Sequence, residues 1–526
     1  MTALEELLGK GEEAQEAFEY EKAIEYFNRG LDESASGDDS SIHPLRGIFL
    51  NNLTRLYTVM GKCDKAQKFL EEIFQNASRI PQEKELFKAW MGRGEIANFR
   101  GEYEEAFSSF QSACELAKWM KSDIDQALSS YNMASSLSRL GQVEEGKSVL
   151  GRSVELLQNV SPCREKERLL AAIHTQYGLE YLREGKSKEA GEAFGLSLSL
   201  TKDQSFCLER AEAFRFLGVV HTIRHDYREG ASHYIEALKI YKKMRHPLGT
   251  AKIYNSLGQL CLTLVKPEEA LLYLEKGLNI CQMLKAEAEA ATIYGKLGNV
   301  HMVMENYSQA ITYFMKDLEL SHRFGSLRTS AYTQHNLGRS FIHKGETKEA
   351  IAYLNEGLRL FKMVDEELNI GRVSQDLCSA YISQGDLNEA EKVGREALLI
   401  FNKLEIVQEE AFTKTLLGVV ERHRTNWDIA ERWFKESLSM LREELSPYYL
   451  AETFYEYGLL CMAIRDTEKA LDMFKASLRL TREVGLRAQT TRNLRIIERI
   501  DDLALINFLF REDSQADPDV PGKKNS

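Results

Sequence analysis

The chain has 526 residues, of which 43% are hydrophobic and 28% are charged, and its formal net charge is −12. This composition excludes a chain that is disordered throughout. The acidic balance argues against a general binder of nucleic-acid phosphates, which usually shows a basic domain or stripe. Only 8 prolines accompany 34 glycines. Scarce proline favours helix over most of the backbone, because a proline costs a helix interior about 3 kcal/mol.

The sequence contains no recognisable membrane or secretion signal. No apolar run approaches the roughly 18 residues of a membrane helix, and the first twenty residues are rich in acid and lack the apolar core of a signal peptide. The eight cysteines stand singly, without a Cys-x-x-Cys pair, which is typical of reduced thiols rather than a disulfide scaffold. We therefore expect a cytoplasmic chain with no membrane-spanning segment.

A small residue recurs along the chain beside phrases such as EEA, KEA and EKA. Successive copies lie 43, 40, 40 and 44 residues apart, and seven further steps are each 40 residues. We call it the second small position, and it is occupied by Ala23, Ala66, Ala106, Gly146, Ala190, Gly230, Ala270, Ala310, Ala350, Ala390, Ala430 and Ala470. This period indicates twelve copies of one structural unit.

Twelve residues before each of these lies another small residue, the first small position, and nine of its twelve occupants are glycine. They are Gly11, Thr54, Gly94, Ala134, Gly178, Gly218, Gly258, Gly298, Gly338, Cys378, Gly418 and Gly458. A bulky residue follows the second small position by four residues everywhere except at Gly394. Because glycine inside a helix is about 1 kcal/mol worse than alanine, the pattern predicts a close approach between packed helices. Gly394 predicts weaker packing in repeat ten.

Each unit is predicted to be a helix, a tight turn often marked by glycine, and a second helix. In chain order, twelve such pairs form a solenoid over residues 1–485, with polar insertions at 32–42 and 158–167. A capping helix is expected over 486–510, because solenoids need their open ends covered. Residues 511–526 have no packable pattern and are expected to be disordered.

Two stretches match a known signature closely: KLGNVHMVMENYSQAITYFMKDLEL (296–320) and NLGRSFIHKGETKEAIAYLNEGLRL (336–360). The chain resembles the tetratricopeptide repeat (TPR) family over roughly residues 3–485, and its unit of 40 residues is similar to the variant in Pins/LGN-type adaptors, rapsyn and MalT-type regulators. The resemblance implies an all-α fold: an α-solenoid, a right-handed superhelix of about twelve TPR helix-turn-helix repeats with a C-terminal capping helix.

No catalytic or metal-binding motif emerges from the sequence. The phrase GKS at 185–187 lacks the upstream glycine and strand of a phosphate-binding loop, and the same turn recurs in other repeats. His221, His225 and His233 lie close together without a cysteine or an HExxH motif. His221 occupies a slot that ring-shaped residues fill elsewhere, which favours packing. We expect neither an enzyme nor a cofactor or metal.

What remains is a surface on the inner wall formed by the first helices. The resemblance implies that positions six and three residues before, and one and five after, the first small position contact bound peptides. The candidate partner-binding residues are Lys252, Asn255, Gln259, Asn299, His335, Arg339, His343, Arg372, Gln375, Ser379, Arg422 and His423. Amides can bond a peptide backbone, and arginine can bind carboxylates through two hydrogen bonds.

These observations predict a non-enzymatic scaffold or adaptor that holds a peptide or helix of another protein in a concave groove. The charge of the groove favours a protein partner with an acidic segment, with no membrane and no nucleic acid. The alternative is a regulatory sensor, whose superhelix responds to a signalling peptide or small ligand and controls an effector. The repeats alone leave both interpretations open.

Overall fold

The computed structural model describes residues 2–34, 43–77, 83–204, 206–323, 327–441 and 446–500. These residues form helices in antiparallel pairs, two helices to each predicted repeat, and a further helix at the end. The chain is an all-α solenoid, as the period predicts. It divides into two compact units, residues 1–326 (unit 1) and 327–526 (unit 2). The boundaries predicted at residues 485 and 510 stay predictions.

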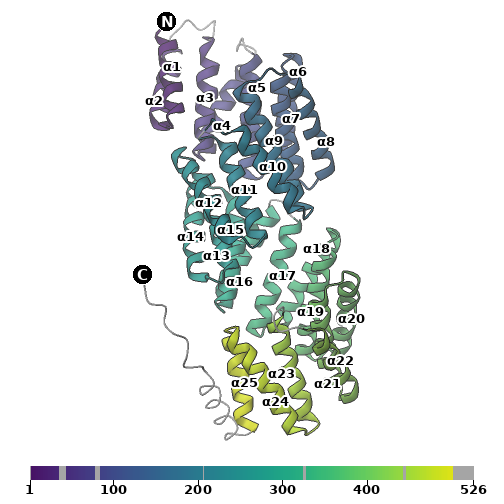
Figure 1. Cartoon of the computed structure of the whole chain (residues 1–526). Helices are drawn as coiled ribbons and strands as arrows, with labels where there is room; N and C mark the ends of the chain where they lie inside the picture. Colours follow the sequence, from purple (N-terminus) through teal and green to yellow (C-terminus); the bar gives the residue numbers. More distant parts are fainter. Residues whose placement is uncertain are drawn as a thin grey trace, which may run out of the picture. The chain divides into compact units, whose positions relative to one another are not determined.

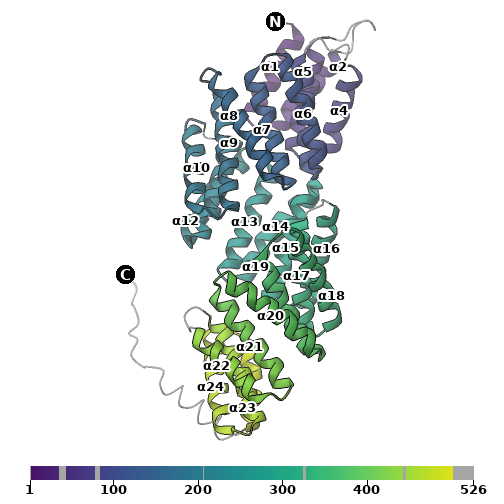
Figure 2. The same ribbon diagram turned by 90° about the vertical axis from the view of Figure 1, so that its right-hand side faces the viewer.

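Unit 1 contains repeats one to eight. Its helices are α1 (Ala3–Glu16), α2 (Tyr20–Glu33), α3 (Leu45–Val59), α4 (Cys63–Gln75), α5 (Glu83–Arg100), α6 (Tyr103–Trp119), α7 (Asp123–Arg139), α8 (Val143–Gln158), α9 (Arg164–Arg183), α10 (Ser187–Leu200), α11 (Leu208–Ile223), α12 (Tyr227–Lys243), α13 (Pro247–Thr263), α14 (Pro267–Leu284), α15 (Glu287–Val303) and α16 (Tyr307–Arg323). Figure 1 and Figure 2 show its pairs stacked in chain order.

Unit 2 contains repeats nine to twelve and the last helix. Its helices are α17 (Leu327–Lys344), α18 (Thr347–Met363), α19 (Glu367–Gln384), α20 (Leu387–Lys403), α21 (Val407–His423), α22 (Trp427–Met440), α23 (Pro447–Ala463), α24 (Thr467–Glu483) and α25 (Arg487–Ile500). Ile497 of α25 is fully buried in one cluster with Phe474 and Leu478 of α24. This packing agrees with a capping role, although the apolar segment Leu503–Phe510 and the predicted tail lie outside the described residues.

The first small position receives a large side chain from the second helix of the same pair. A Cβ atom built on Gly298 would lie 2.4 Å from Cε1 of Phe314, and one on Gly218 would lie 2.5 Å from Cε1 of Tyr234. The same contact pairs Gly11 with Phe27, Gly94 with Phe110, Gly178 with Phe194, Gly258 with Leu274, Gly338 with Leu354, Gly418 with Phe434 and Gly458 with Phe474. Glycine therefore makes room for a ring or a leucine rather than for a backbone.

Repeat ten departs from this pattern at both positions. Cys378 stands at its first small position and is fully buried, and its sulfur would lie 3.2 Å from a Cβ built on Gly394. Leu417 of the next repeat lies 3.0 Å from the same point. Leu417 and Cys378 thus lie next to Gly394, where other repeats have a bulky residue, and the weaker packing predicted from Gly394 stays a prediction.

The turns between paired helices place one residue in the left-handed region of backbone conformation. Six of the predicted turn glycines have positive φ: Gly61, Gly101, Gly141, Gly185, Gly345 and Gly385. In other repeats a residue with a side chain takes this conformation, including Val265 at φ 55°. Such a residue is strained, because its Cβ approaches the following carbonyl oxygen.

The first helices of the pairs line the inner side of each curved stack. First helices of neighbouring repeats contact each other; examples are α3 with α5, α9 with α11, α19 with α21 and α21 with α23. Among the described residues, the second helices of neighbouring repeats make hardly any such contacts. The helices that come together between successive repeats lie on the shorter, concave side of a bend. The inner wall predicted from the sequence is therefore formed by the odd-numbered helices.

Candidate partner-binding faces

The structure divides the predicted partner-binding residues between the two units. Lys252, Asn255, Gln259 and Asn299 belong to unit 1, and the other eight belong to unit 2. All of them lie on odd-numbered helices. Their residue types had suggested one continuous run, but each unit has to be considered by itself.

Several of the predicted amides join neighbouring repeats. Nδ2 of Asn255 donates to Oε1 of Glu289 at 3.1 Å and to Oγ1 of Thr292 at 3.0 Å. In unit 2, Nε2 of Gln375 donates to the carbonyl oxygen of Glu409 at 3.1 Å and to Oγ1 of Thr413 at 2.9 Å. Both amides are buried. Their hydrogens are therefore already used within the fold and are not free for a peptide.

A sequence signal for these joints exists, although the sequence reasoning did not use it. Each amide three residues before a first small position has a glutamate 34 residues later, nine before the next first small position. Asn51 shows the same pattern and donates to Oε2 of Glu85 at 2.7 Å. The pairing of an amide with a glutamate at this spacing predicts a joint between repeats.

The cations of unit 2 also have acidic neighbours that the sequence reasoning missed. Nε2 of His335 lies 2.6 Å from Oδ2 of Asp376, and Nε of Arg339 lies 3.8 Å from the same oxygen. Against the upward effect of burial, the hydrogen bond to His335 and the nearby charges lower the pKa of Asp376. Nε of Arg372 lies 3.2 Å from Oε1 of Glu409. The cationic run is therefore locally compensated.

The remaining predicted residues differ in their surroundings. Nη2 of Arg422 pairs with Oε2 of Glu456 at 2.9 Å, and the exposed ring of His423 follows it in sequence. Oγ of Ser379 donates to the carbonyl oxygen of Gln375 at 3.4 Å. His343 is exposed near the charge of Asp376. In unit 1, Nζ of Lys252 approaches Glu212 at 4.0 Å, Gln259 is exposed and Asn299 is half-buried.

Charged groups on α17, α19, α23 and α25 of unit 2 influence the pKa of Tyr448, at the start of α23. Its side chain is accessible, yet burial raises its pKa to about 12, with Glu452 adding to the effect and Arg339 and Arg492 opposing it. Arg339 comes from α17, Asp376 from α19, Tyr448 from α23 and Arg492 from α25.

Unit 1 has a feature that nearest-neighbour stacking does not predict, because its early repeats contact its late ones. Oη of Tyr20 donates to the carbonyl oxygen of Met244 at 2.7 Å. Nη1 of Arg245 lies 3.1 Å from Oε2 of Glu21, and Nζ of Lys285 lies 3.1 Å from Oδ2 of Asp64. We call these contacts the seam, and they join α2 and α4 to the ends of α12 and α14.

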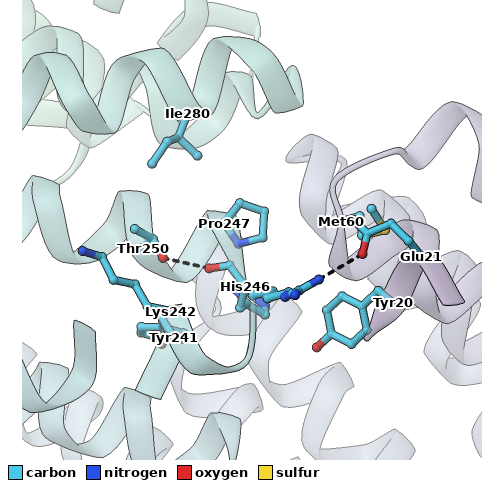
Figure 3. Close-up of a pocket in the computed structure, with 10 residues that line it drawn as sticks. Tyr20, Glu21, Met60, Tyr241, Lys242, His246, Pro247, Thr250 and Ile280 are labelled. Atoms are coloured by element: carbon cyan, nitrogen blue, oxygen red, sulfur yellow. Dashed lines mark hydrogen bonds and ion pairs between the residues drawn. The ribbon is translucent and has the colours of Figure 1, made fainter. Parts of the chain in front are cut away.

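A cavity of about 350 Å³ lies along the seam. Figure 3 shows Tyr20, Glu21 and Met60 on one side and Tyr241, His246 and Ile280 on the other. Nδ1 of His246 accepts a hydrogen bond from the backbone N–H of Gly249 at 2.9 Å and so caps α13. Burial is the main cause that lowers the pKa of His246 to about 4, and the charge of Lys252 adds to it.

The histidines and the GKS phrase noted in the sequence form a ring contact and a turn. Within the described ranges, no three His, Cys, Asp or Glu side chains come together in a way that could hold a metal ion. No helix in that part of the chain combines the length and apolar character needed to cross a membrane. His221 stacks on His233 with ring centroids 5.1 Å apart, and Gly185 forms a turn between α9 and α10.

Comparisons with known proteins agree with this architecture. A tetratricopeptide repeat family model matches residues 209–283, 289–363 and 409–483, and a model described as Iml2/Tetratricopeptide repeat protein 39 matches residues 40–176. No curated protein gives a significant match over the sequence. Repeats of this kind generally mediate protein–protein interactions, and they generally serve as scaffolds rather than as enzymes.

Solved structures that resemble the chain share little sequence with it. The match to the crystal structure of the APC/C hetero-tetramer Cut9–Hcn1 spans 94% of this chain and 96% of the matched chain, with 13% sequence identity and a TM-score of 0.50. The match to yeast Tom70 spans 98% of this chain and 99% of the Tom70 chain, with 14% sequence identity and a TM-score of 0.36. The match to the apo form of RapI spans 52% of this chain and 99% of the RapI chain, with 16% sequence identity and a TM-score of 0.47. Because it has the helix pairs, the recurring glycines and the matched repeats, the chain belongs to the tetratricopeptide repeat proteins.

Proposed function

We propose that the chain is a non-enzymatic scaffold that binds a peptide or helical segment of a partner protein on the inner face of unit 2. The observation that carries the proposal is the pairing of Arg339 with Asp376, 3.8 Å apart on neighbouring inner helices, while the side chain of Arg339 stays 49% exposed. Extended concave faces are the surfaces with which solenoids bind their partners. Tyrosine and arginine are also the residues most enriched where binding energy concentrates.

Among the predicted residues, Arg339 and Arg372 are the best suited to contact a partner. Their side chains are 49% and 46% exposed, and each is held by a single carboxylate. The paired carboxylates are only 28% and 10% exposed, so they keep their arginines, but a guanidinium has five N–H donors and can bind a carboxylate of the partner in addition. Asn255 and Gln375, by contrast, serve to join repeats. We therefore assign recognition of an acidic segment to the two arginines.

The test compares two double variants with the same change of net charge. In the first, Arg339→Glu and Arg372→Glu alter the inner face. In the second, Arg359→Glu and Arg395→Glu alter second helices of the same two repeats, where the side chains are 57% and 58% exposed and each pairs with a nearby glutamate. Affinity purification with mass spectrometry identifies the proteins that bind the wild type, and purified segments of them are then titrated directly.

We expect the inner-face variant to lose these partners and the outer-face variant to retain them. Circular dichroism has to show native helix content in both variants. Equal retention of partners by both variants would refute the assignment to the inner face. Equal loss in both would show that net charge, rather than a site, governs binding.

A second candidate function is a sensor for a small ligand, and the cavity at the seam favours it. A ligand held there touches both α2 and α12 to α14, so it would bias how tightly unit 1 closes. Because a ligand that binds only the native state stabilises it, thermal shift measurements with pools of metabolites and peptides test this function. Stabilisation that disappears in Tyr20→Ala, while Tyr26→Ala retains it, would support the sensor.

A further inference from the structure

The cavity at the seam has an apolar lining that comes from both sides of the closure. Its volume of about 350 Å³ falls within the range of small-molecule sites, about 300–1,000 Å³. Met60 of repeat two lies on one side, and Pro247 and Ile280 of repeat seven lie on the other (Figure 3). The ring of Tyr20 adds to this lining, because its hydroxyl is already bonded to the carbonyl oxygen of Met244. The cavity therefore suits the apolar body of a small molecule.

The charges that line the cavity are two cations and one carboxylate. Nη1 of Arg245 lies 3.1 Å from Oε2 of Glu21. Lys242 makes no hydrogen bond or ion pair through its side chain within the described part of the chain. Glu19 also feels the charge of Arg245, but it is held by Lys22 at 2.8 Å. The lining thus has one positive charge more than it has carboxylates.

Two of the lining groups have N–H donors left over. A guanidinium has five N–H donors in a planar fork. The single bond from Nη1 of Arg245 to Glu21 leaves its Nε and Nη2 side by side, which is the geometry that binds a carboxylate through two hydrogen bonds. Nδ1 of His246 accepts the N–H of Gly249, so the neutral ring carries its proton on Nε2. Among the described residues Nε2 has no hydrogen-bond partner, and protein atoms do not enclose it.

We propose that the seam cavity binds a small organic carboxylate, whose charged group lies on Nε and Nη2 of Arg245 and whose apolar body packs between Met60 and Ile280. The site rests on the sensor function proposed above and names its class of ligand. One carboxylate matches the single excess positive charge of the lining, whereas a phosphate group carries a charge of about −1.5 to −2. Because the ligand contacts repeats two and seven together, it favours the closed form of the seam.

The test measures the binding of three probes to the full chain by ligand-observed nuclear magnetic resonance titration. Hydrocinnamate supplies a carboxylate on an apolar body, hydrocinnamamide has the same body without the charge, and acetate has the charge without the body. We expect hydrocinnamate to bind in the millimolar range or more tightly. The amide should bind about tenfold more weakly, because hydrogen bonds to charged groups are about twice as strong as neutral ones. Acetate should give no saturable binding.

Two variants of one ion pair separate a binding role of Arg245 from a structural one. Arg245→Gln and Glu21→Gln each remove the pair, so the seam loses the same contact in both. Arg245→Gln also removes the donors and should weaken hydrocinnamate binding by about tenfold. Glu21→Gln frees the guanidinium from a competing carboxylate and should strengthen it by about 1.5- to 5-fold. The matched controls for net charge are Lys243→Gln and Glu25→Gln, two exposed positions outside the lining that should leave binding unchanged.

Equal affinity for hydrocinnamate and its amide, or no saturable binding of hydrocinnamate at millimolar concentration, would overturn the carboxylate site. The site would also be overturned if Arg245→Gln and Glu21→Gln changed the affinity in the same direction, since the ion pair would then act only as a structural contact. Controls that shift the affinity as much as these variants would show that net charge governs binding, with the same consequence for the site.

Amide hydrogen exchange of α2 and α4, measured with and without hydrocinnamate, distinguishes this site from the sensor function. We expect exchange to slow when the ligand binds across the seam. Binding without slower exchange would refute the sensor and leave the carboxylate site standing. A neutral metabolite that stabilises the protein through Tyr20, while hydrocinnamate does not bind, would refute the class of ligand and leave the sensor standing.

Discussion

Replacing Gly298 by alanine tests the packing rule that recurs through the repeats. The added Cβ would lie 2.4 Å from Cε1, 2.6 Å from Cδ1 and 2.7 Å from Cζ of Phe314. The phenyl ring has no exposed surface, so it cannot move aside without displacing its own neighbours. Overpacking of a buried site costs about 1–3 kcal/mol, and alanine regains about 1 kcal/mol of helix propensity. We expect a net destabilisation of up to about 2 kcal/mol.

A control glycine isolates the steric contribution. Gly195 lies in the interior of α10, is exposed, and has no atom within 4 Å of a built Cβ. Gly195→Ala should stabilise unit 1 by about 1 kcal/mol through propensity alone. The same substitution thus has opposite signs at two helical sites. Urea denaturation followed by circular dichroism measures both changes in the free energy of unfolding.

A double-mutant cycle then identifies the atoms responsible. Phe314→Ala removes the ring and by itself should cost about 3–5 kcal/mol. In that background Gly298→Ala should no longer destabilise, so the two changes are coupled by about 1–3 kcal/mol. If Gly298→Ala is as stabilising as Gly195→Ala, or if the two changes in the cycle simply add, the reasoning from ring contact is refuted.

Other predictions concern the turns, the pH dependence and the thiols. Val265→Gly should stabilise unit 1 by about 1–2 kcal/mol, since it relieves a left-handed residue, and Gly185→Val should destabilise it similarly; thermal unfolding measures both, and equal signs would contradict the strain. Burial lowers the folded-state pKa of His246 to about 4, below the ordinary histidine value of 6.5, so the unfolded chain binds the proton first as the pH falls. Stability present above pH 6.5 should fall between pH 6.5 and 4 by up to about 1.4 kcal/mol per pH unit, and His246→Asn, which keeps a helix cap, should reduce that slope. Native protein should react with a thiol reagent at Cys163 alone, the one exposed cysteine in the described residues; rapid labelling of more thiols would contradict their burial.

The sequence alone predicts most of the fold, because its period carries the information. Spacing and small residues are sufficient to place the helix pairs, the turns and the inner wall. At the first small position we expected two helix backbones to approach each other closely. The structure instead places a side chain of the second helix, such as Phe314, against the glycine. The approach of Leu417 to Gly394 could not be inferred, because Leu417 belongs to the next repeat.

The candidate site was harder to predict than the fold. A rule that assigns inner positions from one repeat at a time does not see the partner from the next repeat. For this reason Asn255 and Gln375 looked available for a peptide. In the structure, Asn255 donates to the carboxylate of Glu289, and Gln375 donates to the carbonyl oxygen of Glu409. The seam was beyond reach for another reason. Its residues are more than 220 positions apart, and their approach depends on the summed curvature of several repeats.

That closure restricts how unit 1 can evolve. A linear stack of repeats gains or loses a unit at little cost, because each repeat contacts only its neighbours. In unit 1, a duplication or deletion of forty residues between Asp64 and Arg245 would shift every later repeat by one step. Arg245 and Lys285 would then miss Glu21 and Asp64. The number of intervening repeats is thereby fixed as firmly as the number of strands in a closed barrel.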